Sequence, residues 1–196
     1  MEYNRYHCSL CEYPVSEERK TDLPRENDTP AHAALLGLLM SQPRHGYELY
    51  REFSHELGRV WQIGLSQLYA QLKQLQEAGL VAAQTEPQPS RPPRKVYHLT
   101  AEGRDVFLHW LHQPTPYLRL IRVEFLARLY FFHRLSVRGL DELVAAQKVT
   151  CHEQANRFGR LAAEAPDGFQ RLVLEFRQGQ LEAVIPWLDR CLEILT

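Results

Sequence analysis

The sequence predicts a mainly α-helical protein of two parts, and three observations support this. Residues 30–79 contain three segments whose apolar residues recur at helical spacing. Residues 80–100 contain two short extended stretches around a proline-rich tip, which is typical of a β-hairpin. From residue 117 onward helical spacing returns and continues along the chain. Three helices followed by a hairpin form a winged helix-turn-helix, so we predict that fold with a two-stranded wing, followed by an α-helical dimerisation domain.

The first two predicted helices are separated by Pro43. Thr29 supplies an N-cap hydroxyl and Pro30 suits the first helical position, so the apolar run AHAALLGLLM is expected to be helical and to end near Ser41. The second helix is expected over residues 45–58, because one of its faces carries the apolar and aromatic residues Tyr47, Tyr50, Phe53 and Leu57.

The third helix is expected to begin at Leu65 and to end before Gly79. One face of this helix is apolar and carries Leu65, Leu68, Leu72 and Leu75. Serine and glutamine side chains project from the other faces. In a winged helix-turn-helix the third helix enters the major groove of DNA, so we predict that this segment is the recognition helix.

The wing is expected to consist of strands at residues 80–85 and 95–99, with a basic tip between them. Glutamine pairs with adenine through two hydrogen bonds, and lysine and arginine neutralise phosphates. Each polar residue of the third helix taken alone is more typical of a solvated surface, and only their clustering on one element supports DNA binding. The predicted DNA-binding residues are Ser66, Gln67, Tyr69, Gln71, Lys73, Arg91, Arg94 and Lys95.

Helices are expected to make up the rest of the chain. Thr100 caps a predicted helix over residues 101–112, and further helices are expected at residues 117–135 and 140–163. A long amphipathic helix follows Gly168, with a kink expected at the internal proline, Pro186. The length and apolarity of the last two helices predict a partner chain, which we expect to be a second copy.

The predicted organisation has three segments. Residues 1–28 are expected to form a flexible arm, residues 29–113 a DNA-binding domain and residues 117–196 a dimerisation domain.

Residues 31–112 contain an ordered set of short motifs, which are HGYEL at residues 45–49, Leu68-Tyr69 with Leu72 and Leu75, Gly79-Leu80-Val81, Tyr97, Leu99-Thr100 and Gly103. With these motifs the segment closely resembles the PadR family of transcriptional regulators. It implies a dimer, usually a repressor, that binds an inverted repeat in a promoter and is released by a small effector, with no enzymatic activity and no cofactor. It also implies that Tyr69 touches the DNA backbone. The segment RVEFLARLYFF and the terminal helix with Trp187 resemble the helical C-terminal domain of longer members.

An effector pocket is expected between the two domains. Aromatic side chains that could form its walls are Trp61, Phe107, Trp110, Tyr117 and Phe125. The alternative is that these residues are ordinary core.

The pair Cys8 and Cys11 departs from the family pattern, in which chains begin close to the first helix. A Cys-x-x-Cys pair supplies only half of a tetrahedral zinc site, and no second pair follows, so no metal is predicted. Zinc binding and a redox-sensitive disulfide remain open as alternatives.

Composition limits the remaining function classes. The net charge is −1 at pH 7, so DNA binding depends on a local basic patch, and a winged helix that binds a protein instead of DNA is the alternative function. No apolar run reaches the roughly 20 residues of a membrane span and no signal peptide is evident, so a cytoplasmic protein is expected. Motifs for phosphate loops, nucleophile elbows and zinc proteases do not occur, so we expect no enzyme.

Overall fold

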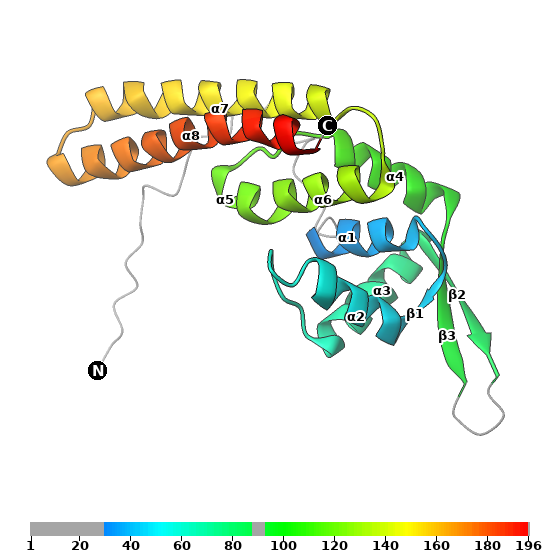
Figure 1. The fold of residues 1–196 in the computed structure, drawn as a ribbon. Helices are drawn as coiled ribbons and strands as arrows, with labels where there is room; N and C mark the ends of the chain where they lie inside the picture. The colour runs from blue at the N-terminus through cyan, green and yellow to red at the C-terminus, as the bar shows by residue number, and fades with distance from the viewer. Residues whose placement is uncertain (1–29, 88–92, 196) are drawn as a thin grey trace, which may run out of the picture.

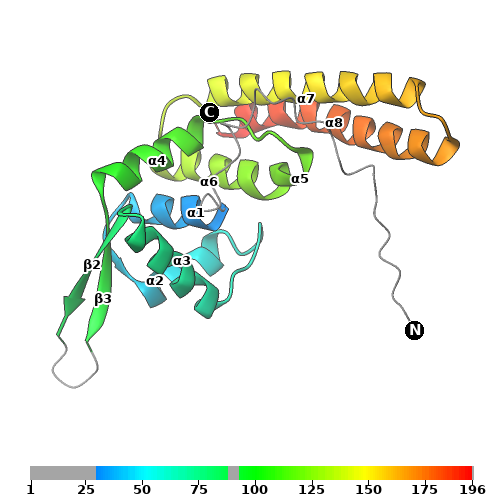
Figure 2. The ribbon, with the colours of Figure 1, turned by 180° about the vertical axis from the view of Figure 1, so that it is seen from behind.

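The computed structural model describes residues 30–87 and 93–195, and it contains two helical parts joined side by side (Figure 1). The predicted arm, the cap residue Thr29 and the wing residue Arg91 lie outside the described residues. In both views the helical hairpin of α7 (Leu140–Ala163) and α8 (Gly168–Leu195) lies on the far side of α6 (Leu126–Leu135) from the wing (Figures 1 and 2).

The first part has the winged helix-turn-helix order. It contains α1 (Pro30–Leu39), α2 (Gly46–Glu56) and α3 (Leu65–Glu77), followed by antiparallel strands β2 (Val81–Glu86) and β3 (Arg94–Leu99). Two residues predicted on the apolar faces, Tyr47 and Leu65, are exposed. Other apolar side chains of the three helices converge, so that Leu35, Leu49, Phe53, Leu68 and Leu72 are completely buried. Burial of these side chains supplies the main free energy that holds the three helices together.

A third strand extends the predicted two-stranded wing. The strand β1 (Arg44–His45) pairs antiparallel with β3, which gives the sheet order β1-β3-β2. A two-residue strand has no periodicity of its own, so only its pairing with Tyr97 and Val96 in the folded chain reveals it. The wing is therefore anchored directly to the residue that precedes α2.

Thr100 joins the wing to α4 (Ala101–His112). Its Oγ1 accepts a hydrogen bond from the Gly103 amide at 3.0 Å, which is the predicted N-cap. The same hydroxyl lies 2.9 Å from the carbonyl oxygen of Gly79 and 3.0 Å from that of Leu80. One side chain thus connects the residues that follow α3, the wing and α4.

The second part begins with a helix that changes its geometry. Where one helix was predicted over residues 117–135, the structure has α5 (Leu118–Leu120), a π-helical segment η3 (Ile121–Phe125) and α6 in succession. The helix α8 continues through Pro186. No helix among the described residues is long and apolar enough to cross a membrane.

Candidate nucleic-acid interface

The outer surface of α3 is polar. Ser66, Gln67 and Lys73 are exposed and Gln71 is half-buried, whereas Leu68, Leu72 and Leu75 on the opposite face lie in the core. Leu65, predicted on the apolar face, is 38% exposed because it is the first residue of α3. Lys73 Nζ lies 3.5 Å from Glu77 Oε1, a solvent-exposed ion pair that is easily exchanged for another anion. This face is therefore free of apolar packing and rich in hydrogen-bonding groups, as major-groove recognition requires.

Tyr69 lies where α3 meets α2 and the wing. Its ring packs over Gly46, the first residue of α2, and 42% of Tyr69 remains exposed. Burial raises the pKa of Tyr97 of β3, and the neighbouring Tyr69 raises the same pKa further. The Tyr69 phenol is thus held at a corner of the domain and still reaches solvent.

The wing carries the remaining predicted residues. Arg94 and Lys95 are exposed at the start of β3, opposite Glu86 and Thr85 of β2. Figure 2 shows β2 and β3 projecting beyond the three helices. His45 connects the wing to α2, since its ring Nε2 lies 4.0 Å from Glu86 Oε2. The basic side chains of Arg94 and Lys95 therefore lie at the projecting end of the wing, where Arg94 is opposite Glu86.

Glu52 links α2 to both β1 and α6. Its carboxylate lies 2.6 Å from Arg44 Nε and 3.7 Å from Arg134 Nη2. Burial, chiefly, raises the pKa of the adjacent Tyr130 to about 12. Sequence reasoning did not identify this connection, because it joins residues far apart in the chain.

A buried arginine occupies the junction between the two parts. Arg128 Nε donates to the Trp110 carbonyl oxygen at 2.9 Å, and its Nη1 donates to Thr115 Oγ1 at 3.0 Å and to Glu124 Oε2 at 3.2 Å. The guanidinium carbon lies 4.3 Å from the centre of the Trp110 ring.

Gln147 of α7 holds the chain segment between the two parts. Its side-chain oxygen accepts from the Thr115 amide at 2.6 Å, and its nitrogen donates to the Thr115 carbonyl at 3.1 Å. The backbone amide and the backbone carbonyl of Thr115 are therefore both hydrogen-bonded to the side chain of Gln147.

The five aromatic residues of the predicted effector pocket do not all meet. Phe107 and Trp110 are neighbours, with ring centres 6.1 Å apart. The other three contact different residues, Trp61 packing on Phe53, Phe125 on Trp187, and Tyr117 beneath Arg119. Phe107 and Phe125 are completely buried.

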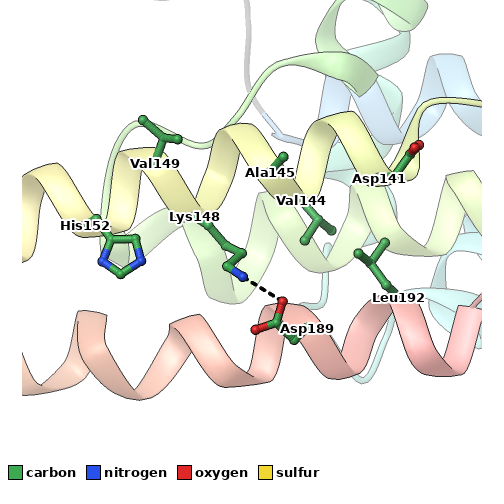
Figure 3. Close-up of a pocket in the computed structure, with 8 residues that line it drawn as sticks. All are labelled: Asp141, Val144, Ala145, Lys148, Val149, His152, Asp189 and Leu192. Carbon is green, nitrogen blue, oxygen red and sulfur yellow. Dashed lines mark hydrogen bonds and ion pairs between the residues drawn. The ribbon is translucent and has the colours of Figure 1, made fainter.

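An open pocket of about 380 Å³ lies between α7 and α8 (Figure 3). The ion pair of Lys148 and Asp189, with 2.7 Å between Nζ and Oδ1, crosses it. None of the five predicted aromatic residues lines this pocket.

Thiols and metal ligands are sparse in the described part of the chain. Residues 30–87 and 93–195 contain no group of three histidine, cysteine or acidic side chains placed to hold a metal ion, and Cys8 and Cys11 lie outside them. Cys151 and Cys191 are buried, and burial raises the pKa of the Cys191 thiol to about 11. That thiol is protonated and therefore unreactive at neutral pH.

Comparison with known proteins gives two family matches that together span most of the chain. Residues 35–108 match the Transcriptional regulator PadR-like family, and residues 121–196 match the family Virulence activator alpha C-term. The negative transcriptional regulator PadR of Bacillus subtilis is 29% identical over 83% of this chain and 95% of its own. A probable transcriptional regulator of Mycobacterium tuberculosis is 35% identical over 41% of this chain and 43% of its own. The crystal structure of Bacillus subtilis PadR in complex with operator DNA has 26% identity, covers 83% of this chain and 96% of that one, and gives a TM-score of 0.43.

Proposed function

Because the chain belongs to the PadR-like family of transcriptional regulators, we propose that it is a homodimeric repressor that binds a palindromic operator and is released by a small aromatic effector. The observation that carries the proposal is the exposed polar face of α3 beside a projecting basic wing. The relative from Bacillus subtilis, which aligns with most of the chain, is a negative regulator, and this supports repression.

The proposed DNA contacts divide by chemistry. Ser66, Gln67 and Gln71 read base edges in the major groove, since their side chains both donate and accept hydrogen bonds. The remaining proposed contacts bind phosphates and fix the position of the domain on the duplex, and they are Tyr69, Lys73, Arg91, Arg94 and Lys95.

The proposed dimer surface is an apolar stripe on α8. Phe169, Leu172, Val173 and Phe176, spaced by three, one and three residues, are 76%, 65%, 40% and 66% exposed. Large apolar side chains rarely form a contiguous exposed patch on a monomeric protein. In the proposed dimer the same stripe of a second copy covers them symmetrically. Such a dimer presents two recognition helices to the two halves of a palindrome.

DNA binding is tested by gel shift at several salt concentrations, with a duplex selected from random sequences by rounds of binding. Wild type should bind tightly and lose affinity steeply as salt rises, because phosphate contacts release counterions. Tyr69→Ala and Arg94→Ala should each weaken binding about tenfold. Arg94→Ala should also flatten the salt dependence by about one unit of slope, because it removes one phosphate contact.

Arg104→Ala is the matched control, since Arg104 is exposed on α4 and lies outside the proposed surface. Its affinity and salt slope should equal those of wild type. Failure to select any duplex at low salt would instead favour a winged helix that binds a protein.

The proposed effector site lies at the junction of the two parts, where Trp110 is half-buried against Phe107 and Arg128. Among the aromatic residues that the sequence suggested for this pocket, Phe107 is the one whose ring lies beside Trp110. Flat aromatic compounds should therefore quench the fluorescence of Trp110 in a variant carrying Trp61→Phe and Trp187→Phe, and they should release the DNA. Unchanged fluorescence together with release of DNA would place the effector elsewhere.

A further inference from the structure

The ring of Tyr69 occupies space that only a glycine leaves open. A Cβ atom on Gly46 would lie 2.5 Å from Tyr69 Cε1 and 3.0 Å from both its Cζ and its hydroxyl oxygen. Side chains do not approach a Cβ as closely as 2.5 Å. An alanine at this position would therefore displace the ring or the start of α2.

Backbone conformation does not explain the glycine. Among the described residues, the glycines with positive φ are Gly79 and Gly139, so Gly46 has a backbone that other residues adopt. Alanine is also the better helix former, and Gly46 is the first residue of a regular helix. Contact with Tyr69 is thus the structural reason for glycine at this position.

The contact lies between three elements of the proposed DNA surface. Tyr69 belongs to α3, Gly46 begins α2, and His45, the residue before Gly46, pairs with Val96 of the wing strand β3. Gly46 is itself buried, whereas 42% of Tyr69 is exposed, so one side of the phenol packs on backbone and the other faces outward.

We propose that Gly46 is a positioning residue for DNA binding, which acts by letting the Tyr69 phenol lie against the start of α2 with its hydroxyl directed at a DNA phosphate. The inference rests on the proposed function. Gly46 itself touches no DNA and contributes only through Tyr69. Since a phenol fixed by packing loses little conformational freedom on binding, its hydrogen bond to phosphate is stronger than that of a mobile side chain.

The test is a double-mutant cycle with the full-length protein and the selected duplex. Gly46→Ala and Tyr69→Phe should each weaken binding about tenfold, the loss expected for one hydrogen bond to a charged group. The double variant should bind no more weakly than the weaker single variant, because the hydroxyl that Gly46 positions is already absent. Gly168→Ala is the matched control, since Gly168 also begins a helix and a Cβ there meets nothing within 4 Å.

Thermal unfolding examines the packing independently of DNA. Gly46→Ala should lower the Tm, and Tyr69→Ala in the same chain should recover part of the loss by removing the clashing ring. This readout also applies if Gly46→Ala alone is too unstable for the gel shift.

Two outcomes would overturn the inference and leave the proposed function intact. These are wild-type affinity in Gly46→Ala, and losses that simply multiply in the double variant. If wild type binds no duplex, the proposed function and this inference both fail.

Discussion

Replacing Arg128 by alanine is expected to lower the free energy of unfolding by about 3–5 kcal/mol, the cost of breaking a buried ion pair. The Arg128 side chain is only 3% exposed and that of its partner Glu124 only 13%. Burial lowers the pKa of Arg128, and the Glu124 carboxylate, 3.2 Å from Nη1, opposes this change. Its removal leaves a carboxylate, the Trp110 carbonyl and the Thr115 hydroxyl without a donor in the interior.

The measurement is urea-induced unfolding followed by circular dichroism at one protein concentration, because a dimer's stability depends on concentration. Arg122→Ala is the control, since Arg122 is exposed on the preceding segment η3 and should change the free energy by less than about 0.5 kcal/mol. Equal midpoints for Arg128→Ala and Arg122→Ala would show that the buried network does not stabilise the fold.

Replacing Phe176 by glutamate is expected to convert the proposed dimer to a monomer and to weaken binding to the selected duplex by about 100-fold or more. A carboxylate at position 176, the C-terminal end of the α8 stripe, would have to be desolvated in the dimer with nothing to pair with it. The monomer then binds each half-site alone and loses the high effective concentration of the second recognition helix, which is worth about 10²–10⁴-fold.

Light scattering with gel filtration gives the mass, and gel shift gives the affinity. Glu175→Gln is the control, because it changes the neighbouring residue and removes only an exposed ion pair with Arg171. A Phe176→Glu protein that remains dimeric would place the dimer surface elsewhere, and the Val149 side of α7 would be the next candidate because Val149 is 57% exposed.

The sequence predicted most helix and strand positions because their ends depend on local residues. Gly79, Thr100 and Pro43 each end or begin an element through their own backbone or side-chain chemistry, and the predicted helix 140–163 has the bounds of α7. The strand β1 and the π-helical segment η3 were missed, because long-range pairing and packing determine them.

The candidate site was predictable in part. The spacing of apolar and polar residues along α3 correctly indicated that Leu68, Leu72 and Leu75 face inward and that Ser66, Gln67 and Lys73 face outward. It was wrong for Leu65, which is exposed, and the contact of the outward residues with DNA stays a prediction. The motif HGYEL contained Gly46, yet the reason for that glycine lies in Tyr69, which comes much later in the chain. The aromatic residues gave less information about the effector pocket. Trp61 packs on Phe53 and Phe125 packs on Trp187, and the sequence does not show these contacts.

In the proposed dimer, the α7–α8 hairpin would act as a lever arm between the dimer surface and the winged part. The 28 residues of α8 span roughly 42 Å at about 1.5 Å per residue, and Figure 1 shows the turn between α7 and α8 pointing away from the wing. With the stripe near that turn as the fixed point, a rotation of about 10° displaces the opposite end of the hairpin by roughly 7 Å, a geometric consequence of its length. The hydrogen bonds between Gln147 of α7 and the backbone of Thr115 would couple part of this movement to the segment that follows α4. In the proposed complex, a small change in dimer angle would therefore disturb the fit to successive major grooves, which lie about 34 Å apart.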